Sequence, residues 1–84
     1  MYRVVWTKSA QKGLKKLDFS ISEKLVYKVE NYLTKNPWKF GKPLVGGYKG
    51  CYRYRMGDFR MIYQVKEKEL IILVLRAGHR KEIY

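Results

Sequence analysis

The chain has 84 residues, a length that predicts one domain, 1–84. Its content of 46% hydrophobic and 15% aromatic residues is too high for a disordered chain. No apolar run reaches the roughly 20 residues of a membrane span, and no signal peptide is expected. The single cysteine, Cys51, permits no internal disulfide, and this absence fits a cytoplasmic protein. Nineteen Lys and Arg residues against seven Asp and Glu give a net charge of +12, which favours a nucleic acid or an acidic protein as partner.

The first part of the sequence predicts a strand and then a helix. Residues 2–6 are rich in β-branched and aromatic side chains, as strands are. Thr7 can cap the following helix, in which apolar residues recur at helical spacing over residues 10–17. Gly13 lies inside this helix and is expected to weaken it by about 1 kcal/mol relative to alanine.

A second helix is predicted directly after a short turn. Ser20 and Glu23 have the spacing of a capping box, and an apolar stripe follows over residues 21–33. The helix is expected to end near Asn36, because Pro37 disfavours the helical conformation of the residue before it. Two amphipathic helices joined by a short turn predict a helical hairpin that packs on a sheet.

Three more strands are predicted after a turn-rich connector. The connector, residues 37–50, has room for a short edge strand, and its Gly46-Gly47 pair lacks the Lys and Ser or Thr of a phosphate-binding loop. Residues 51–56 and 59–66 alternate in polarity, whereas residues 70–75 are uniformly hydrophobic and are expected to form a central strand that is buried on both faces.

These elements predict an α+β fold of the order β-α-α-β-β-β. The first strand needs a partner, and the last strand offers a free edge. The expected sheet is therefore four-stranded and mostly antiparallel, in the order 1-4-3-2 by strand number, with the helical hairpin on one face.

The uncovered face of this sheet is predicted to carry a cluster of arginines. Arg53 and Arg55 are two residues apart, so they project from one face of their strand, and Arg60 joins them across the Gly57-Asp58 turn. Arg80 follows the last strand. Like charges that face each other across a sheet are unfavourable, so the cluster favours an anion, and phosphate matches the fork of arginine. The alternative is a solvated basic surface.

Other kinds of active site lack the necessary residues. One histidine and one cysteine cannot form a zinc site, and no metal or other cofactor is predicted. No carboxylates are paired as glycoside hydrolysis requires, and no spacing supports a Ser-His-Asp triad.

Four stretches carry a family resemblance that extends over nearly the whole chain: residues 5–17, 51–55, 57–65 and 76–84. The segments at residues 57–63, Gly-Asp-Phe-Arg-Met-Ile-Tyr, and 78–84, Gly-His-Arg-Lys-Glu-Ile-Tyr, are specific as a pair. On these residues the chain resembles the RelE family of bacterial and archaeal toxins, which implies a RelE-like fold with the architecture described above.

The resemblance implies a toxin that inhibits translation by cutting messenger RNA, typically in the ribosomal A site, without a metal. The implied reaction is attack of an RNA 2′-OH on the adjacent phosphate. The implied partners are the ribosome with its message and an antitoxin whose acidic and apolar residues cross the face of the sheet that carries the arginines. Two alternatives remain open: a ParE-like toxin that inhibits gyrase, and an RNA-binding domain without enzymatic activity.

The resemblance also assigns roles to residues of this sequence. Arg53, Arg55 and Arg60 would stabilise the charge of the transition state, and Arg80 would give electrostatic help near the leaving group. The proton acceptor is left open between two tail residues, His79 and Tyr84. The lysines that could follow RNA phosphates, or only keep the protein soluble, are Lys12, Lys15, Lys16, Lys42, Lys49 and Lys81.

Overall fold

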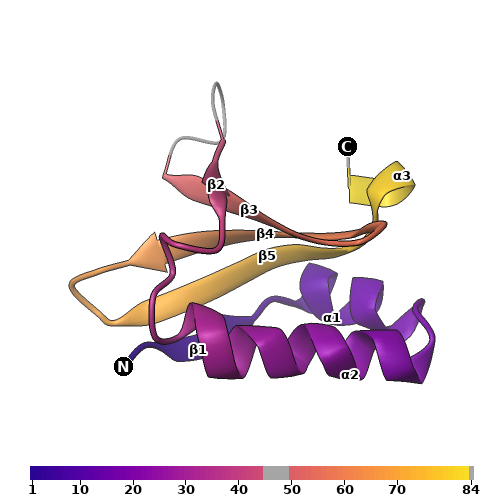
Figure 1. Ribbon diagram of the computed structural model, residues 1–84, viewed down its shortest axis with the longest axis horizontal. Coiled ribbons are helices and arrows are strands. Elements are labelled where there is room, and N and C mark those ends of the chain that lie inside the picture. The colour runs from indigo at the N-terminus through magenta and orange to yellow at the C-terminus, as the bar shows by residue number, and fades with distance from the viewer. Residues whose placement is uncertain (45–49, 84) are drawn as a thin grey trace.

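A computed structural model of the chain describes residues 1–44 and 50–83. The main helices and strands follow one another in the predicted order, and there are three additional short elements, η1, β2 and α3 (Figure 1). In chain order they are β1 (Arg3–Trp6), α1 (Lys8–Lys15), α2 (Phe19–Lys28), the π-helical segment η1 (Val29–Leu33), β2 (Lys42–Pro43), β3 (Cys51–Met56), β4 (Phe59–Lys66), β5 (Ile71–His79) and α3 (Arg80–Ile83).

The strands form one mixed sheet with the order β1-β5-β4-β3-β2. The predicted α+β fold and the order of the four main strands are confirmed, and β2 adds a two-residue strand at the edge of β3. β1 runs parallel to β5, whereas all other neighbours are antiparallel. Figure 1 shows both α1 and α2 below the sheet, so neither of them covers the opposite face, and the short α3 lies at one end of the sheet.

The two main helices begin differently. Thr7 caps α1 as predicted, because its hydroxyl oxygen accepts a hydrogen bond from the backbone N–H of Ala10 at 3.1 Å. The predicted capping box of α2 is wrong: the N-cap residue is Asp18 and not Ser20, so the helix begins two residues earlier than predicted, at Phe19, and Asp18 makes no side-chain cap. None of the helices in the described part of the chain has the length and apolar character that a membrane crossing requires.

The main core lies between the helices and the sheet. Leu33 of η1 packs there with Met61 and Tyr63 of β4 and with Ile72 and Val74 of β5, all without exposure to solvent. The prediction that β5 is buried on both faces is wrong. Its residues alternate between buried and half-buried positions over Ile71 to Leu75, because α1 and α2 cover only one face.

Gly13 permits close packing of α1 on the sheet. A Cβ atom at this position would lie 1.8 Å from the backbone oxygen of Ala77 in β5. The helix therefore approaches the strand more closely than any side chain would allow. The glycine lowers the helix propensity of α1, and in return it permits this contact with Ala77, which could not be predicted from the sequence.

Candidate active site

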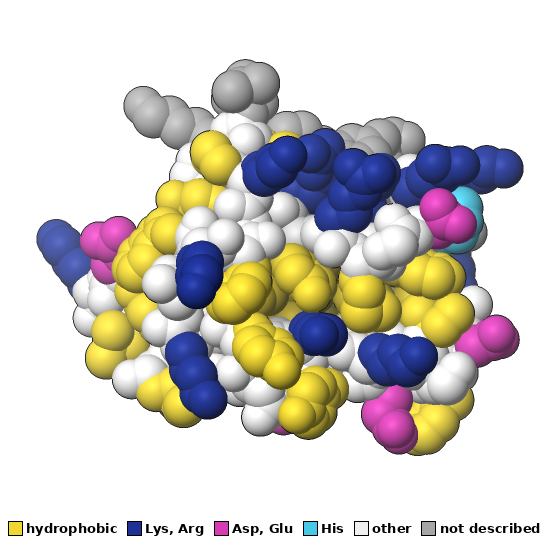
Figure 2. All heavy atoms as spheres, viewed as in Figure 1, with side chains coloured by type: hydrophobic (Ala, Val, Ile, Leu, Met, Phe, Trp, Pro, Cys, Tyr) yellow, Lys and Arg dark blue, Asp and Glu magenta, His cyan; other side chains and the backbone are white. Residues whose placement is uncertain are grey.

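Three arginines share the uncovered face of the sheet, as predicted. Arg55 of β3 pairs directly with Arg60 of β4, and Arg53 pairs with Ile62. Residues paired in this way have Cβ atoms about 5 Å apart, so Arg55 and Arg60 are neighbours on one surface. Figure 2 shows Lys and Arg side chains gathered above the sheet, on the side away from α1 and α2.

A fourth arginine reaches this face through an irregularity in β5. Ile62 pairs with Arg76 and Tyr63 pairs with Val74, so Leu75 is an extra residue that has no direct partner in β4. Such a bulge changes the alternation of the strand, and Arg76 therefore lies on the same face as Ile62 and not opposite to it. We call the surface formed by Arg53, Arg55, Arg60 and Arg76 the basic face.

The basic face is compact. Neighbouring strands lie about 4.8 Å apart, so Arg53 and Arg76, on the two sides of Ile62, are separated by about 10 Å. Arg60 lies between Arg55 and Gly78, and Gly78 has no side chain to occupy the position beside it. The Nε and Nη1 atoms of Arg60 are shielded from solvent. Lys42 pairs with Arg53 and extends the positive charge to the edge of the sheet.

The sheet includes more residues of the predicted tail than expected. β5 continues to His79, and Arg80 begins the single helical turn of α3. The backbone N–H of Arg80 donates a hydrogen bond of 2.8 Å to the carbonyl oxygen of Asp58 in the β3–β4 turn. The Arg80 Nε also lies 3.8 Å from Asp58 Oδ1. The turn thus anchors α3 at the end of the sheet that carries Arg55 and Arg60.

His79 points away from the basic face. It pairs with Phe59, which alternates with Arg60 along β4, and the two rings meet edge to face with centroids 5.6 Å apart. The Nδ1 atom of His79 accepts a hydrogen bond of 3.2 Å from the backbone N–H of Lys81. This lone pair is therefore already engaged, and the structure does not bring His79 together with the arginines.

The predicted lysines lie in several places. Lys12, Lys15 and Lys16 are exposed on and after α1, which covers the opposite side of the sheet. Lys42 borders the basic face, and Lys81 is exposed on α3. Lys49 and Tyr84, together with the Gly46-Gly47 pair, lie outside the described residues.

The described residues offer neither a reactive cysteine nor a group of metal ligands. Cys51 is buried on the same side of the sheet as Ile62, and its burial raises the pKa of the thiol above its ordinary value. Within residues 1–44 and 50–83, no three His, Cys, Asp or Glu side chains are grouped as a metal site requires.

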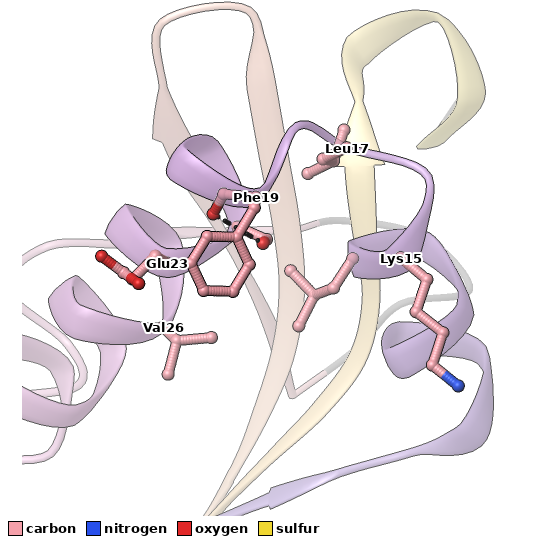
Figure 3. A pocket seen from close by; sticks show the side chains of 7 residues that line it. Lys15, Leu17, Phe19, Glu23 and Val26 are labelled. Carbon is pink, nitrogen blue, oxygen red and sulfur yellow. Dashed lines mark hydrogen bonds between the residues drawn. The ribbon is translucent and has the colours of Figure 1, made fainter.

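A separate hollow of about 470 Å³ lies between α1 and α2, away from the basic face. Figure 3 shows Phe19 in the middle of it, near Val26 and Leu17, with the charged ends of Lys15 and Glu23 directed outward. The lining is mainly apolar, and Lys15, Ser22 and Glu23 are its polar members. This hollow is a surface for apolar contact and is distinct from the candidate active site.

The chain is similar to toxins over almost its whole length. Residues 4–84 match the family described as the ParE toxin of the type II toxin–antitoxin system parDE. Toxin RelG of Mycobacterium tuberculosis is 31% identical over 83 residues, which cover 99% of this chain and 95% of that protein. The toxin–antitoxin complex RelBE2 from M. tuberculosis contains a chain that matches with a TM-score of 0.88 at 30% identity, covering 94% of this chain and 98% of that one. The isolated Escherichia coli RelE toxin matches with a TM-score of 0.77 at 23% identity, over 94% of this chain and 84% of that one, which shows a common fold.

Proposed function

The chain belongs to the RelE/ParE superfamily of type II toxins, and from this premise we propose that it is an endoribonuclease that cuts messenger RNA at its basic face. Cleavage of message in the ribosomal A site would inhibit translation, and the protein would then act in the cytoplasm. The proposed enzyme is independent of metal ions, because its arginines supply the positive charge that a metal would supply in other nucleases.

The observation that supports this proposal most directly is the pairing of Arg55 with Arg60. Two unit charges 4 Å apart repel each other by about 1 kcal/mol even in bulk water, so a fold gains nothing by placing them opposite each other. A bound phosphate converts this repulsion into attraction, and each guanidinium can donate two parallel hydrogen bonds to its oxygens. Arg53 and Arg76 flank the pair at distances that suit the neighbouring phosphates of an RNA strand.

The proposed reaction is an internal transfer. The RNA 2′-oxygen attacks the adjacent phosphorus while its proton passes to a base, and the bond to the 5′-oxygen breaks as that oxygen takes up a proton. The products are a 2′,3′-cyclic phosphate and a free 5′-OH. Negative charge accumulates on the pentavalent phosphate, where Arg53, Arg55 and Arg60 are proposed to stabilise it, with Arg76 as a further donor.

The proposed roles of the tail residues follow from their positions. Arg80 is held at the end of the sheet by Asp58 and is proposed to stabilise the leaving oxygen. His79 would have to give up its hydrogen bond from Lys81 and turn to the other side of the sheet before it could accept a proton. Tyr84 is the other predicted base, and that assignment rests on the sequence alone.

The proposed protein partner is a cognate antitoxin. The similar chains of M. tuberculosis and E. coli are found in RelBE toxin–antitoxin complexes. An antitoxin segment with acidic and apolar residues would neutralise the basic face and would contact Leu44 and Leu75, which are partly buried beside Ile62. Binding there would exclude RNA, which is a direct way to inhibit the proposed enzyme.

Expression of the chain with and without substitutions tests the proposal. The wild type should arrest growth and leave discrete cuts in ribosome-bound message, mapped by primer extension. Arg60→Ala and Arg80→Ala should each abolish both effects without loss of the fold, as judged by circular dichroism. Full toxicity of both variants would reject the assigned site.

Inhibition of gyrase is the second candidate function, and the match to the ParE toxin family favours it. A DNA supercoiling assay distinguishes the two toxins, because a gyrase inhibitor leaves messages intact and changes DNA topology. An RNA-binding domain without activity would retain RNA and release no cyclic phosphate.

A further inference from the structure

A group of exposed aromatic side chains lies outside the basic face, around the end of α2. Tyr27, Tyr32 and Phe40 are 57%, 41% and 40% exposed. They form a chain of edge contacts: the rings of Tyr27 and Tyr32 have centroids 6.3 Å apart, and those of Tyr32 and Phe40 have centroids 5.8 Å apart. We call these three residues, with Lys28 and Lys39, the aromatic surface.

The π-helical segment η1 brings the two tyrosines together. In an α-helix, residues five positions apart lie on different sides, because one turn takes 3.6 residues. In a π turn the hydrogen bonds join residues five apart, and here the backbone N–H of Thr34 donates to the carbonyl oxygen of Val29 at 3.1 Å. Tyr27 and Tyr32 are also five residues apart and therefore meet. Such turns are frequent at functional positions of helices.

Lysines stand over the rings of this surface. The Lys28 Nζ lies 4.8 Å from the centroid of Tyr32, and the Lys39 Nζ lies 5.6 Å from the centroid of Phe40. A shallow hollow of about 220 Å³ is lined by Lys28, Tyr32, Phe40 and Tyr54. It is smaller than the pockets of about 300–1,000 Å³ that hold whole small-molecule ligands, and it suits a single planar ring.

The aromatic surface is continuous with the basic face around the β2–β3 edge. Phe40 precedes Lys42 by two residues, and Lys42 pairs with Arg53 of the basic face. Tyr54 follows Arg53 in β3 and projects to the other side of the sheet, where it lines the hollow. Figure 2 shows the same transition, from the dense Lys and Arg side chains above the sheet to lysines separated by hydrophobic side chains over α2.

We infer that the aromatic surface binds single-stranded RNA by stacking an unpaired base against Tyr32 and Phe40. This inference rests on the proposed function, because the RNA strand that reaches the hollow is the one held on the basic face. Aromatic rings next to lysines are the combination that binds single strands without sequence preference: the rings stack on bases and the cations follow phosphates. The net charge of +12 favours RNA over a cationic or neutral protein segment at this surface.

The binding of a short RNA to the whole chain tests this inference. The probe is a single-stranded RNA with 2′-O-methyl groups, which cannot be cut by 2′-OH attack, and affinity is measured by fluorescence anisotropy. Tyr32→Ala and Phe40→Ala should each weaken binding about 5-fold to 150-fold, whereas Phe40→Trp should restore it. Phe19→Ala is the matched control, because Phe19 is 78% exposed in the separate hollow between α1 and α2, and it should bind as the wild type does.

The salt dependence separates stacking from charge. The two alanine variants should keep the slope of log affinity against log salt, whereas Lys28→Gln should reduce it by about 0.7. Unchanged RNA affinity of Tyr32→Ala and Phe40→Ala would overturn the inference, as would a loss confined to binding of the antitoxin. Absence of cleavage by the wild type, with RNA binding that still depends on Tyr32 and Phe40, would reject the ribonuclease proposal and leave the stacking surface in place.

Discussion

Arg55 and Arg60 face each other directly across the β3–β4 hairpin, on the side of the sheet opposite to α1 and α2. Gly57 makes the tight turn between their strands possible, with a φ of 61° at the first turn position. A slip of either strand by one residue would move every side chain of that strand to the other face, because the side-chain period of a strand is two. The register therefore fixes two positive side chains opposite each other, and we expect an anion bound between them to lower their repulsion.

Removal of one charge from this pair should stabilise the protein while it damages the site. We expect Arg55→Thr to raise the free energy of unfolding by about 0.2–1 kcal/mol at low salt, because a like-charge pair is lost and threonine favours strands. The same variant should cut RNA about 100-fold to 1,000-fold more slowly. Urea denaturation and a cleavage time course measure the two effects.

Arg55→Lys is the control for that prediction. It keeps the positive charge, so the gain in stability should be absent, but it loses the fork that matches phosphate. A gain in stability for Arg55→Lys equal to that of Arg55→Thr would show that repulsion with Arg60 is not the cause.

Arg76 should contribute to RNA cleavage although it lies on a different strand from the predicted cluster. We expect Arg76→Ala to reduce the cleavage rate by about 10-fold to 100-fold, because it removes one charged donor from the basic face. Arg3→Ala is the matched control: Arg3 pairs with Ile71 at the other end of β5. Equal effects of the two substitutions would mean that only total charge matters.

Gly13→Ala should destabilise the fold, contrary to helix propensity. The added methyl group would collide with the carbonyl oxygen of Ala77 and push α1 away from β5, at a cost of about 1–3 kcal/mol. Lys12→Ala, an exposed change on the same helix, should leave the free energy of unfolding nearly unchanged. Thermal or urea denaturation compares the two variants, and a more stable Gly13→Ala would contradict the close packing.

The stability of the protein should fall in alkaline solution because of Tyr63. Its hydroxyl is buried and donates to the carbonyl oxygen of Pro37, and burial raises the pKa of Tyr63 above the value of about 10 for an exposed tyrosine. The folded state therefore holds this proton more tightly than the unfolded state. The stabilisation is complete below pH about 10 and is lost as the pH rises toward the pKa of the folded state.

Tyr63→Phe isolates this contribution. At neutral pH the variant should be less stable by about 1–3 kcal/mol, because the Pro37 carbonyl loses its partner in the core. The difference in free energy of unfolding between wild type and variant, measured by urea denaturation, should narrow above pH about 10. A difference that is constant up to high pH would contradict the assigned role of the proton.

Much of the fold could be predicted because the strands obey a simple period. β3 and β4 alternate without interruption, so the common face of Arg53, Arg55 and Arg60 followed from counting residues. Thr7 could be identified as a cap because its hydroxyl satisfies a local backbone donor at a fixed spacing.

The missed features depend on contacts between distant segments. The bulge at Leu75 shifts β5 relative to β4 and brings Arg76 to the basic face, and the parity of β5 alone could not show this. The pairing with Phe59 extends β5 to His79 and turns that ring away from the arginines. Gly13 looked like a weak point of a helix, because the position of the Ala77 carbonyl was not known.

Analysis of RNA ends tests the central claim most directly. Purified wild-type chain is added to a translation reaction, and the ends of the fragments are determined with Arg60→Ala as the matched inactive variant. We predict fragments with a 2′,3′-cyclic phosphate on one side of each cut and a 5′-OH on the other, formed by the wild type alone. Intact message in a reaction whose translation the wild-type chain still inhibits, or 5′-phosphate ends at the cuts, would contradict an arginine-stabilised 2′-OH attack on the basic face.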